Sequence, residues 1–230
     1  MSYKLYSRQG TPEQLRNMIN TCRSKGVRVY ADAVVNHMVG NGNDMFPNHC
    51  SGSTYWGNKN SSGGSPFWSQ GFAYENWRVT GSRPGMEMPA VPYGPNDFHC
   101  ARSLNSWTDG FILNYGWLVN LADLNTETEY VRQRIADYFS TLLGMGFSGF
   151  RIDAAKHISP ANLAAIFARF KANHNGNIPE DFITYLEVII GGEKSLLMCE
   201  DNPYNYGSTF AKYMQQAGLS ETDIAKVKIW

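Results

Sequence analysis

Two charged side chains interrupt one apolar segment of the sequence and could act on a substrate together. Arg151 and Asp153 lie two residues apart in residues 149–153 (GFRID), a pattern that predicts a β-strand, so both side chains project from the same face. An arginine buried beside an aspartate is costly unless a site uses the pair. Arg151 would favour the ionised form of Asp153, which a nucleophile requires. A structural ion pair at the end of a strand is the alternative interpretation.

A second apolar segment, residues 185–190 (YLEVII), contains one acidic residue, Glu187. An acid lodged among apolar side chains is desolvated, which raises the pKa of its carboxyl group towards the range of a general acid. At the surface end of a strand the same residue would have no such role. Together, Asp153 held ionised and Glu187 pushed towards neutrality, on adjacent strands, would provide the two carboxyl groups that glycoside hydrolysis uses.

Oxygen donors at two further strand ends could hold a metal ion. One predicted strand ends in residues 32–37 (DAVVNH), and Asp123 lies in residues 121–124 (LADL). Asn36 supplies a neutral oxygen and Asp123 a carboxylate, and oxygen ligands from distant segments suit Ca²⁺. Residues of these types near strand ends also serve as caps, so their spacing leaves both interpretations open.

The elements that must position these residues follow a helix-then-strand order. Three helices are predicted by their first residues, at 11–14 (TPEQ) and 126–129 (TETE), where capping boxes occur, and at 159–160 (SP). Their apolar residues recur at helical spacing: Leu15, Met18, Ile19 and Cys22; Val131, Ile135, Tyr138, Phe139 and Leu142; Leu163, Ile166, Phe167 and Phe170. Strand-like runs at 27–35, 147–153 and 182–190 favour parallel strands joined by helical crossovers.

A long insertion separates the first two of these strands. Residues 39–117 contain five of the six tryptophans, and in residues 51–65 (SGSTYWGNKNSSGGS) 12 of 15 are Gly, Ser, Thr or Asn. An insertion that leaves the C-terminal end of a parallel strand belongs on the catalytic face of a barrel. We therefore predict that residues 1–38 and 118–230 form part of a barrel, domain A, and that residues 39–117 form an inserted domain B. A decorative loop or a linker is the alternative.

Composition excludes several classes of protein. The 230 residues include 20 basic and 20 acidic side chains, a net charge of zero, so no basic footprint indicates a nucleic-acid partner. No apolar run reaches the ~18 residues of a membrane span. Cys50 and Cys100 could pair if the protein is secreted, Asn60 begins a glycosylation sequon, and Cys22 is expected to be a core thiol. No signal peptide is visible, and the chain opens directly into a folded pattern, so we expect a missing upstream part.

These segments resemble those of the α-amylases of glycoside hydrolase family 13. Residues 32–37 (DAVVNH), 149–157 (GFRIDAAKH) and 186–189 (LEVI) resemble the first, second and third conserved blocks of the family, in the same order. Residues 118–125 (LVNLADLN) resemble the stretch that re-enters the barrel after domain B. The resemblance implies an α/β fold: a partial (β/α)8 TIM barrel, strands three to five, with a loop-rich domain B inserted after the third barrel strand. It also implies retaining endo-hydrolysis of α-1,4-glucosidic bonds in starch or glycogen.

The resemblance further implies a role for each matching residue. Asp153 matches the catalytic nucleophile, Glu187 the general acid/base, and Arg151 the arginine that orients the nucleophile and that contacts chloride in chloride-dependent members. The other implied positions are substrate contacts at Asp32, His37, Lys156, His157, Leu118, Leu121 and Ile189, and Ca²⁺ ligands at Asn36, Asp123 and the His157 carbonyl, with a further backbone ligand near Asn114. A starch or maltooligosaccharide substrate, a secreted or digestive location and a monomeric full-length protein complete these expectations.

The sequence departs from the family pattern where activity is concerned. None of its five histidines is followed by Asp, so the His-Asp pair of the fourth block, whose Asp stabilises the transition state, is absent. Leu186 stands where the family commonly has Gln. We expect an incomplete fragment that is inactive alone. A catalytically inactive starch-binding homologue is the second hypothesis, and a barrel enzyme that uses Lys156 as a Schiff-base amine is the third.

Overall fold

The structure is a computed structural model that describes residues 3, 5, 9–40, 93, 97–99 and 102–229. The chain divides into two compact units: unit 1 is Met1–Lys4 with His37–Val131, and unit 2 is Leu5–Asn36 with Arg132–Trp230. Cys50, Cys100, the Asn60 sequon and most of the predicted domain B lie outside the described residues. The predicted boundaries of domains A and B therefore stay a prediction.

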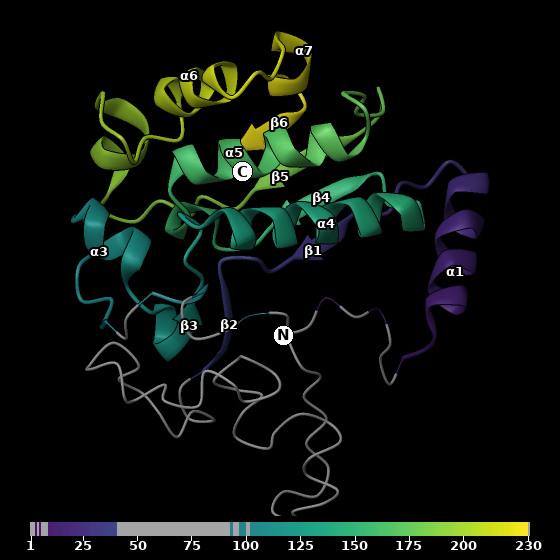
Figure 1. Ribbon diagram of the computed structural model, residues 1–230, viewed down its shortest axis with the longest axis horizontal. Helices are drawn as coiled ribbons and strands as arrows, with labels where there is room; N and C mark the ends of the chain where they lie inside the picture. The colour runs from purple at the N-terminus through teal and green to yellow at the C-terminus, as the bar shows by residue number, and fades with distance from the viewer. Residues whose placement is uncertain are drawn as a thin grey trace, which may run out of the picture. The chain divides into compact units, whose positions relative to one another are not determined.

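Unit 2 is built on a parallel sheet in the order β1-β4-β5-β6 (Figure 1). Its strands are β1 (Ala31–Ala33), β4 (Gly149–Ile152), β5 (Ile183–Leu186) and β6 (Val227–Ile229), and every neighbouring pair is parallel. The predicted parallel pairing of the three strand segments is thus confirmed, although each strand is shorter than its apolar run. The sequence analysis missed β6, because its three residues are too few to show an alternating pattern.

The predicted helices are present, with one error of position. Helix α1 (Pro12–Ser24) begins with the predicted capping box of Thr11. Helix α5 (Pro160–Asn173) begins where the Ser-Pro pair predicted. Helix α4 (Glu129–Met145) was predicted to start after Thr126, which is wrong. The hydroxyl of Thr128 accepts the Val131 N–H at 3.4 Å, so the cap lies two residues later.

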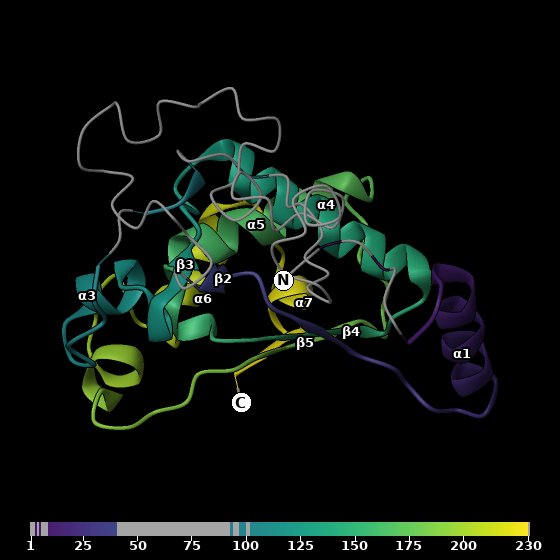
Figure 2. The same ribbon diagram turned by 90° about the horizontal axis from the view of Figure 1, so that it is seen from below.

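The core of unit 2 lies between the sheet and two helices, α4 and α5, which cover one of its faces (Figures 1 and 2). Phe139 of α4 stacks on Phe150 of β4, with ring centroids 4.6 Å apart, and Phe170 of α5 packs on the same ring. The predicted apolar face of α1 is only partly buried, since Ile19 is inaccessible but Met18 is 45% exposed. Large aromatic side chains thus attach α4 and α5 to the sheet.

A glycine makes the close pairing of β4 with β5 possible. A Cβ atom on Gly149 would lie 1.7 Å from the carbonyl oxygen of Ile183, which no side chain can tolerate. The two strands pair in the register Gly149↔Ile183 and Ile152↔Leu186. The glycine that opens the GFRID segment therefore fixes how the ends of these two strands meet.

The rest of unit 2 consists of short elements after β4 and β5. These are η5 (Ala155–His157), the π-helix η6 (Ser195–Cys199), α6 (Ser208–Gln216) and α7 (Glu221–Ile224). A π-helical turn is rare and often occurs at functional sites. Element η5 follows β4, and Glu193 just before η6 accepts from Lys156 of η5 at 2.6 Å, so both elements lie beyond the carboxyl ends of β4 and β5.

Unit 1 contains an antiparallel pair of strands, β2 (His37–Gly40) and β3 (Leu121–Asp123). Helix α3 (Gly110–Tyr115) and the 3-10 turn η4 (Leu118–Asn120) precede β3. The sequence analysis did not predict β2 or β3 as strands, because each is too short for a periodic pattern. Within η4, Val119 has φ of 45°, a left-handed conformation that strains a β-branched residue.

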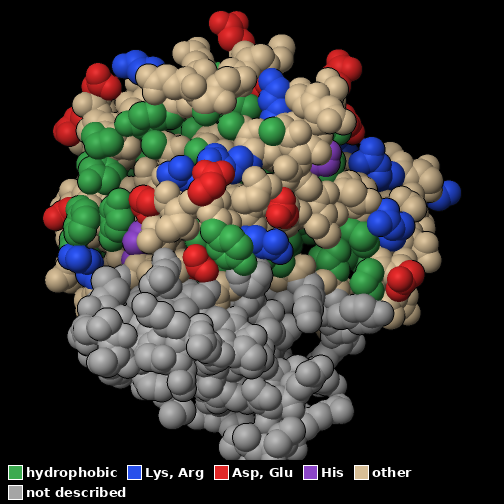
Figure 3. Space-filling model, in the orientation of Figure 1, with side chains coloured by type: hydrophobic (Ala, Val, Ile, Leu, Met, Phe, Trp, Pro, Cys, Tyr) green, Lys and Arg blue, Asp and Glu red, His purple; other side chains and the backbone are tan. Residues whose placement is uncertain are grey.

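The surface agrees with the neutral composition. On the face drawn in Figure 3, acidic and basic side chains are interspersed over the described residues. Among the helices of the described part, none is both long and apolar enough to cross a bilayer. Cys22 and Cys199 carry free thiols, and Cys22 is half-buried rather than in the core.

Candidate active site

Asp153 and Glu187 follow directly after the carboxyl ends of two adjacent parallel strands, β4 and β5. The register Ile152↔Leu186 places them side by side. Their backbones are fixed to the sheet, since the Asp153 N–H donates to the Ala33 carbonyl at 3.1 Å and the Glu187 N–H to the Ile152 carbonyl at 3.0 Å. The carboxyl ends of parallel strands are where α/β barrels place their reactive groups.

One arginine joins three carboxylates at this edge. Arg151 donates from Nη1 to Asp32 at 2.5 Å and to Asp153 at 3.1 Å, and its Nη2 donates to Glu187. We call these four residues the Arg151 cluster. One cation and three carboxylates give it a formal charge of −2. Because Asp153 and Glu187 bind the same guanidinium, the two carboxyl groups face one small volume.

The Arg151 cluster is open to solvent, which corrects the expectation of a buried ion pair. The side chains of Arg151, Asp32, Asp153 and Glu187 are 28%, 63%, 27% and 16% exposed. The strands present them on the face of the sheet that α4 and α5 do not cover, because Asp32 and Arg151 pair in register and alternate with buried residues. Open access is what a group that must meet a substrate requires.

The direction of the pKa shift of Asp153 differs from expectation. Burial raises the pKa of Asp153, Arg151 acts to lower it, and the neighbouring Glu187 raises it again, so its pKa lies above the ordinary value. Burial lowers the pKa of Arg151, but its hydrogen bonds to Asp32 and Asp153 raise it more, so the guanidinium stays charged. The sequence analysis gave Arg151 control of Asp153, but burial and repulsion between carboxylates outweigh it.

A strained residue links the two candidate catalytic groups. Ala154 has φ of 50°, in the left-handed region that side chains rarely adopt. In this conformation its N–H donates to Glu187 Oε2 at 2.9 Å, and the Ala155 N–H donates to the Glu187 carbonyl at 3.1 Å. Strain held by surrounding structure is typical of functional sites. Here it turns the backbone after Asp153 so that it holds the Glu187 carboxylate.

The other predicted positions of unit 2 lie beside this edge but differ in exposure. Lys156 and His157 of η5 are buried, at 8% and 3% exposed, whereas Ile189 is 64% exposed. The single O–H of Tyr206 is shared between the carbonyls of Ala155 and Ile158, which ties η5 to the segment before α6. Ile189 is thus available to a substrate, and the ammonium of Lys156 is directed into the protein.

The predicted positions of unit 1 lie around β2, β3 and η4. His37 is buried at 3% exposed and pairs in register with Asp123. Leu118 and Leu121 are half-buried. Val119 between them is 78% exposed and was not singled out from the sequence. Because Val119 is exposed, strained and next to predicted groove residues, it is a further candidate for contact with a substrate. The sequence does not reveal it, since its strain depends on the backbone conformation.

A second charged cluster, also missed by the sequence analysis, lies in unit 1. His99 contacts Asp123 Oδ2 from Nδ1 at 2.6 Å and Glu127 Oε2 from Nε2 at 2.7 Å. We call these three residues the His99 cluster. Burial lowers the pKa of His99, but hydrogen bonds to Asp123 and Glu127 raise it more, to about 9. Isolated histidines carry no sequence signal for such a contact, because the partners lie 24 and 28 residues away.

The predicted calcium ligands suit a hard cation by their chemistry. Asn36, Asp123 and His157 are 2%, 1% and 3% exposed, and each offers an oxygen, the last through its backbone. Buried oxygen donors of this kind are the ligands that Ca²⁺ prefers. Among the described residues, no group of three or more His, Cys, Asp or Glu side chains is arranged to hold a metal ion. Asn36 and His157 belong to unit 2 and Asp123 to unit 1, so a common site stays a prediction.

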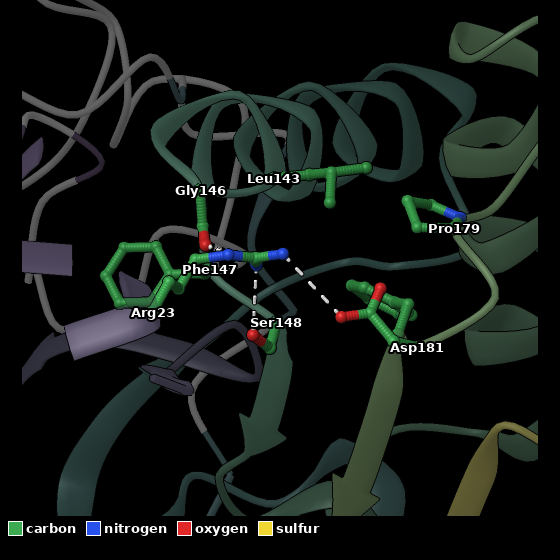
Figure 4. Close-up of a pocket in the computed structure, with 8 residues that line it drawn as sticks. Arg23, Leu143, Gly146, Phe147, Ser148, Pro179 and Asp181 are labelled. Atoms are coloured by element: carbon green, nitrogen blue, oxygen red, sulfur yellow. Dashed lines mark hydrogen bonds and ion pairs between the residues drawn. The ribbon is translucent and has the colours of Figure 1, made fainter. Parts of the chain in front are cut away.

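A cavity of about 300 Å³ in unit 2 lies away from this chemistry (Figure 4). It is lined by Phe147, Ser148 and Phe182, which precede β4 and β5, whereas Asp153 and Glu187 follow these strands. In Figure 4 the guanidinium of Arg23 points to the Gly146 carbonyl at 3.0 Å and towards Asp181 at 3.6 Å. Its charge is already matched, so this cavity is not the candidate site.

Comparison with known proteins identifies the family to which this site belongs. Residues 2–218 match the family model described as "Alpha amylase, catalytic domain". The chain is 37% identical over 200 residues to an alpha-amylase of Tribolium castaneum, covering 84% of this chain and 34% of that protein. It is 33% identical over 202 residues to pancreatic alpha-amylase 2a5 of Mus musculus, with the same coverage. The chain thus spans about one third of the length of these curated relatives.

A solved structure gives the same result. Alpha-amylase I of Eisenia fetida, determined as a glutamate-to-glutamine mutant with maltohexaose, superposes with a TM-score of 0.57 at 28% identity, over 84% of this chain and 35% of that one. With the parallel sheet described above, this confirms the predicted fold class, a partial (β/α)8 barrel, whereas the insertion after the third barrel strand stays a prediction. Since the family match runs through both strands that carry Asp153 and Glu187 and over nearly the whole chain, the chain belongs to the alpha-amylase family.

Proposed function

We propose that this chain supplies the nucleophile and the general acid/base of a retaining endo-hydrolase of α-1,4-glucosidic bonds in starch or glycogen. The Arg151 cluster carries the proposal. It is partly exposed, it has a formal charge of −2, and it holds two carboxyl groups on one guanidinium. The transition state of glycoside hydrolysis resembles an oxocarbenium ion. A cluster with two surplus negative charges stabilises that developing positive charge electrostatically.

The two carboxyl groups take different roles. Asp153 attacks the anomeric carbon and forms a glycosyl-enzyme bond while Glu187 protonates the leaving oxygen; Glu187 then deprotonates the water that releases the sugar. Arg151 holds both groups in place, and the strained Ala154 fixes Glu187 through its N–H. Glu187 is less exposed than Asp153, 16% against 27%.

Substrate and metal contacts are proposed on the family match. Asp32 and Ile189 are exposed, Leu118 and Leu121 are half-buried, and His37 and His157 are buried; we assign all six to the glucan, whereas Lys156 is engaged within the protein. Asn36, Asp123 and the His157 carbonyl hold Ca²⁺, which would supply a structural tie between chain segments and no chemistry. The maltohexaose complex of the Eisenia fetida relative supports a maltooligosaccharide substrate. The pancreatic origin in the name of the mouse relative supports secretion.

The test uses the complete gene product with two substrates. A blocked maltoheptaoside needs both carboxyl groups, whereas α-maltosyl fluoride has a leaving group that needs no protonation. Asp153→Asn is expected to reduce turnover of both substrates by at least about 10³-fold. Glu187→Gln is expected to do so for the maltoheptaoside. With the fluoride it should spare formation of the glycosyl-enzyme, seen as a rapid burst of fluoride release, and slow only the hydrolysis of that intermediate.

Asp201→Asn is the matched control, because Asp201 is 78% exposed and pairs only with Lys212 at 3.6 Å among the ion pairs of the described residues. It should leave both rates within about twofold. Full activity of Asp153→Asn would overturn the proposal. Tight maltooligosaccharide binding without hydrolysis by the unaltered protein would instead support an inactive glucan-binding homologue.

A further inference from the structure

We propose that Tyr206, through its buried phenol, is a positioning residue for the general acid/base: it holds the strained turn after Asp153, and the backbone of this turn holds the Glu187 carboxylate. The turn consists of Ala154 and Ala155 and is called the Ala154 turn below. The catalytic part of this inference rests on the proposed function, whereas the hold of Tyr206 on the turn does not.

The phenol of Tyr206 contacts both ends of η5. Its single O–H is shared between the carbonyl of Ala155, the first residue of η5, and that of Ile158, the residue that follows η5. Tyr206, Ala155 and Ile158 are 1%, 0% and 1% exposed. Buried polar groups are stable only while they are hydrogen-bonded. The phenol and its two acceptors therefore stabilise one another, across sequence separations of 51 and 48 residues.

The backbone that carries Tyr206 is itself fixed. The Tyr206 N–H donates to the Leu197 carbonyl of η6 at 2.7 Å. The neighbouring Asn205 donates from its side chain to the Glu200 carbonyl at 2.8 Å and accepts the Gly207 N–H at 2.7 Å. Burial raises the pKa of Tyr206 well above its ordinary value, so the phenol keeps its proton and stays a donor. Tyr206 thus presents its O–H to η5 from a well-anchored segment.

The Ala154 turn is the part of the site that needs such a hold. Ala154 has φ of 50° and ψ of 35°, a left-handed conformation that costs energy for a residue with a Cβ atom and persists only where the surroundings enforce it. The turn donates twice to Glu187, from the Ala154 N–H to Oε2 at 2.9 Å and from the Ala155 N–H to the carbonyl at 3.1 Å. Relaxation of the turn would withdraw both donors, and the bond from Tyr206 to the Ala155 carbonyl opposes it.

The orientation of the Glu187 carboxylate depends on this turn. Two donors from the described part of the chain reach the carboxylate, the Arg151 guanidinium and the Ala154 N–H. Arg151 also binds Asp32 and Asp153 and is 28% exposed, whereas the Ala154 N–H belongs to the backbone. A small misplacement of a catalytic group reduces the rate strongly. Tyr206 therefore acts on proton transfer without touching the substrate.

Three substitutions in the complete gene product separate this hold from bulk packing. Tyr206→Phe removes the hydroxyl and keeps the ring. Tyr213→Phe is the control, because it removes the same group from a half-buried ring of α6. Ala154→Gly keeps the N–H and admits the left-handed conformation without steric cost. If Tyr206 acts by holding a strained residue, its loss must matter less in the Ala154→Gly background.

The first experiment compares two substrates. Tyr206→Phe is expected to lower kcat for the blocked maltoheptaoside about tenfold with KM within about twofold, because the misplaced group is the proton donor. The burst of fluoride release from α-maltosyl fluoride, which needs no protonation, should stay within about twofold. In the Ala154→Gly background, Tyr206→Phe should cost about twofold or less, and Tyr213→Phe should do the same in the unaltered background. Equal losses on both substrates, or in both backgrounds, would overturn the inference.

The second experiment measures the hold without activity. Tyr206→Phe is expected to speed hydrogen exchange of the Ala154 and Ala155 amides by about tenfold or more, whereas Tyr213→Phe should leave it unchanged. Unchanged exchange in Tyr206→Phe would overturn the hold. If Tyr206→Phe folds only in the Ala154→Gly background, the hold is supported, and failure to fold in both would overturn the positioning role. If the unaltered protein cleaves neither substrate, the proposed function fails, and the exchange experiment still decides the role of Tyr206.

Discussion

The Arg151 cluster of unit 2 and the His99 cluster of unit 1 are built alike but exposed differently. In each, one cation contacts more than one carboxylate. His99 and Asp123 are 12% and 1% exposed and only Glu127, at the edge of the cluster, reaches 37%, whereas Arg151 and Asp32 are 28% and 63% exposed. The aromatic ring of Tyr115 packs on His99 at 4.6 Å, and the Trp117 indole donates to the His99 carbonyl at 3.2 Å.

The difference in exposure shows that contacts between one cation and several carboxylates can have two different roles. A closed cluster can contribute to stability only while each buried charge keeps its partner. An open cluster leaves carboxylate oxygens accessible, and no further ion pair within the described part of the chain matches its surplus negative charge. The first arrangement holds a fold, and the second is suited to act on a substrate. The following predictions test this comparison from the largest expected effect on stability to the smallest.

The largest effect is expected from the closed cluster. His99→Gln removes the cation beside Asp123, whose carboxylate is 1% exposed. Removing a charged partner from a buried carboxylate should lower the free energy of unfolding by about 3–5 kcal/mol, measured by urea denaturation in EDTA. Arg134→Gln is the control, because Arg134 and Asp137 are 3.7 Å apart and 42% and 41% exposed, and should cost under about 1 kcal/mol.

Calcium gives this experiment a second readout. If Asp123 is a Ca²⁺ ligand as proposed, added Ca²⁺ should stabilise the unaltered protein and should offset part of the loss in His99→Gln, since the ion supplies positive charge to the same carboxylate. An unfolding free energy of His99→Gln equal to that of the unaltered protein in EDTA would contradict the structural role of the cluster.

A smaller effect is expected from Asp223, a closed contact in unit 2. Asp223 is 8% exposed, accepts from Lys171 at 2.6 Å, and completes the capping box of α7 with Ser220. Burial raises the pKa of Asp223, but Lys171 and Ser220 lower it more, to below its ordinary value. Because the folded pKa lies below the unfolded one, this contribution is present above about pH 4 and is lost as pH falls through the folded pKa.

Asp223→Asn should therefore lower the free energy of unfolding by about 1–3 kcal/mol at pH 7, and the gap to the unaltered protein should narrow below about pH 4. Urea denaturation across this pH range is the measurement, with Asp201→Asn as the exposed control. A gap that stays constant with pH would mean that the charge of Asp223 is not what stabilises α7.

The sequence predicts those parts of the fold that depend on interactions between residues close together in the chain. Capping residues and apolar spacing act within a few residues, so α1, α5 and the strands around Arg151 and Tyr185 were predicted. The GFRID segment was informative because strand alternation alone places Arg151 and Asp153 on one face. The three-residue strands β3 and β6 were missed, since they exist through their partners.

The candidate site divides in the same way. Asp153, Glu187 and Arg151 could be found because unusual residue types interrupt apolar runs. The burial of Lys156 could not, since its partner Glu193 lies 37 residues away and only the fold joins them. The pKa of Asp153 was predicted in the wrong direction, because it depends on how many carboxylates share one arginine. Residue type thus predicts which side chains belong to the candidate site, and the packing of the fold decides their pKa values and their exposure to solvent.

The smallest effect on stability is expected where the effect on activity is largest, at Asp153. The pKa of Asp153 in the folded protein lies above the ordinary value. Ionised Asp153 therefore destabilises the fold at neutral pH. This cost disappears as pH falls below about 4, because the carboxyl is then protonated in both the folded and the unfolded state. Asp153→Asn removes one of three carboxylates from Arg151. Its free energy of unfolding at pH 7 should be unchanged or higher by up to about 1 kcal/mol, as is common when a reactive group is neutralised, and the difference should shrink towards pH 4. A loss of about 2 kcal/mol or more in urea denaturation would instead place the Arg151 cluster with the closed, stabilising contacts.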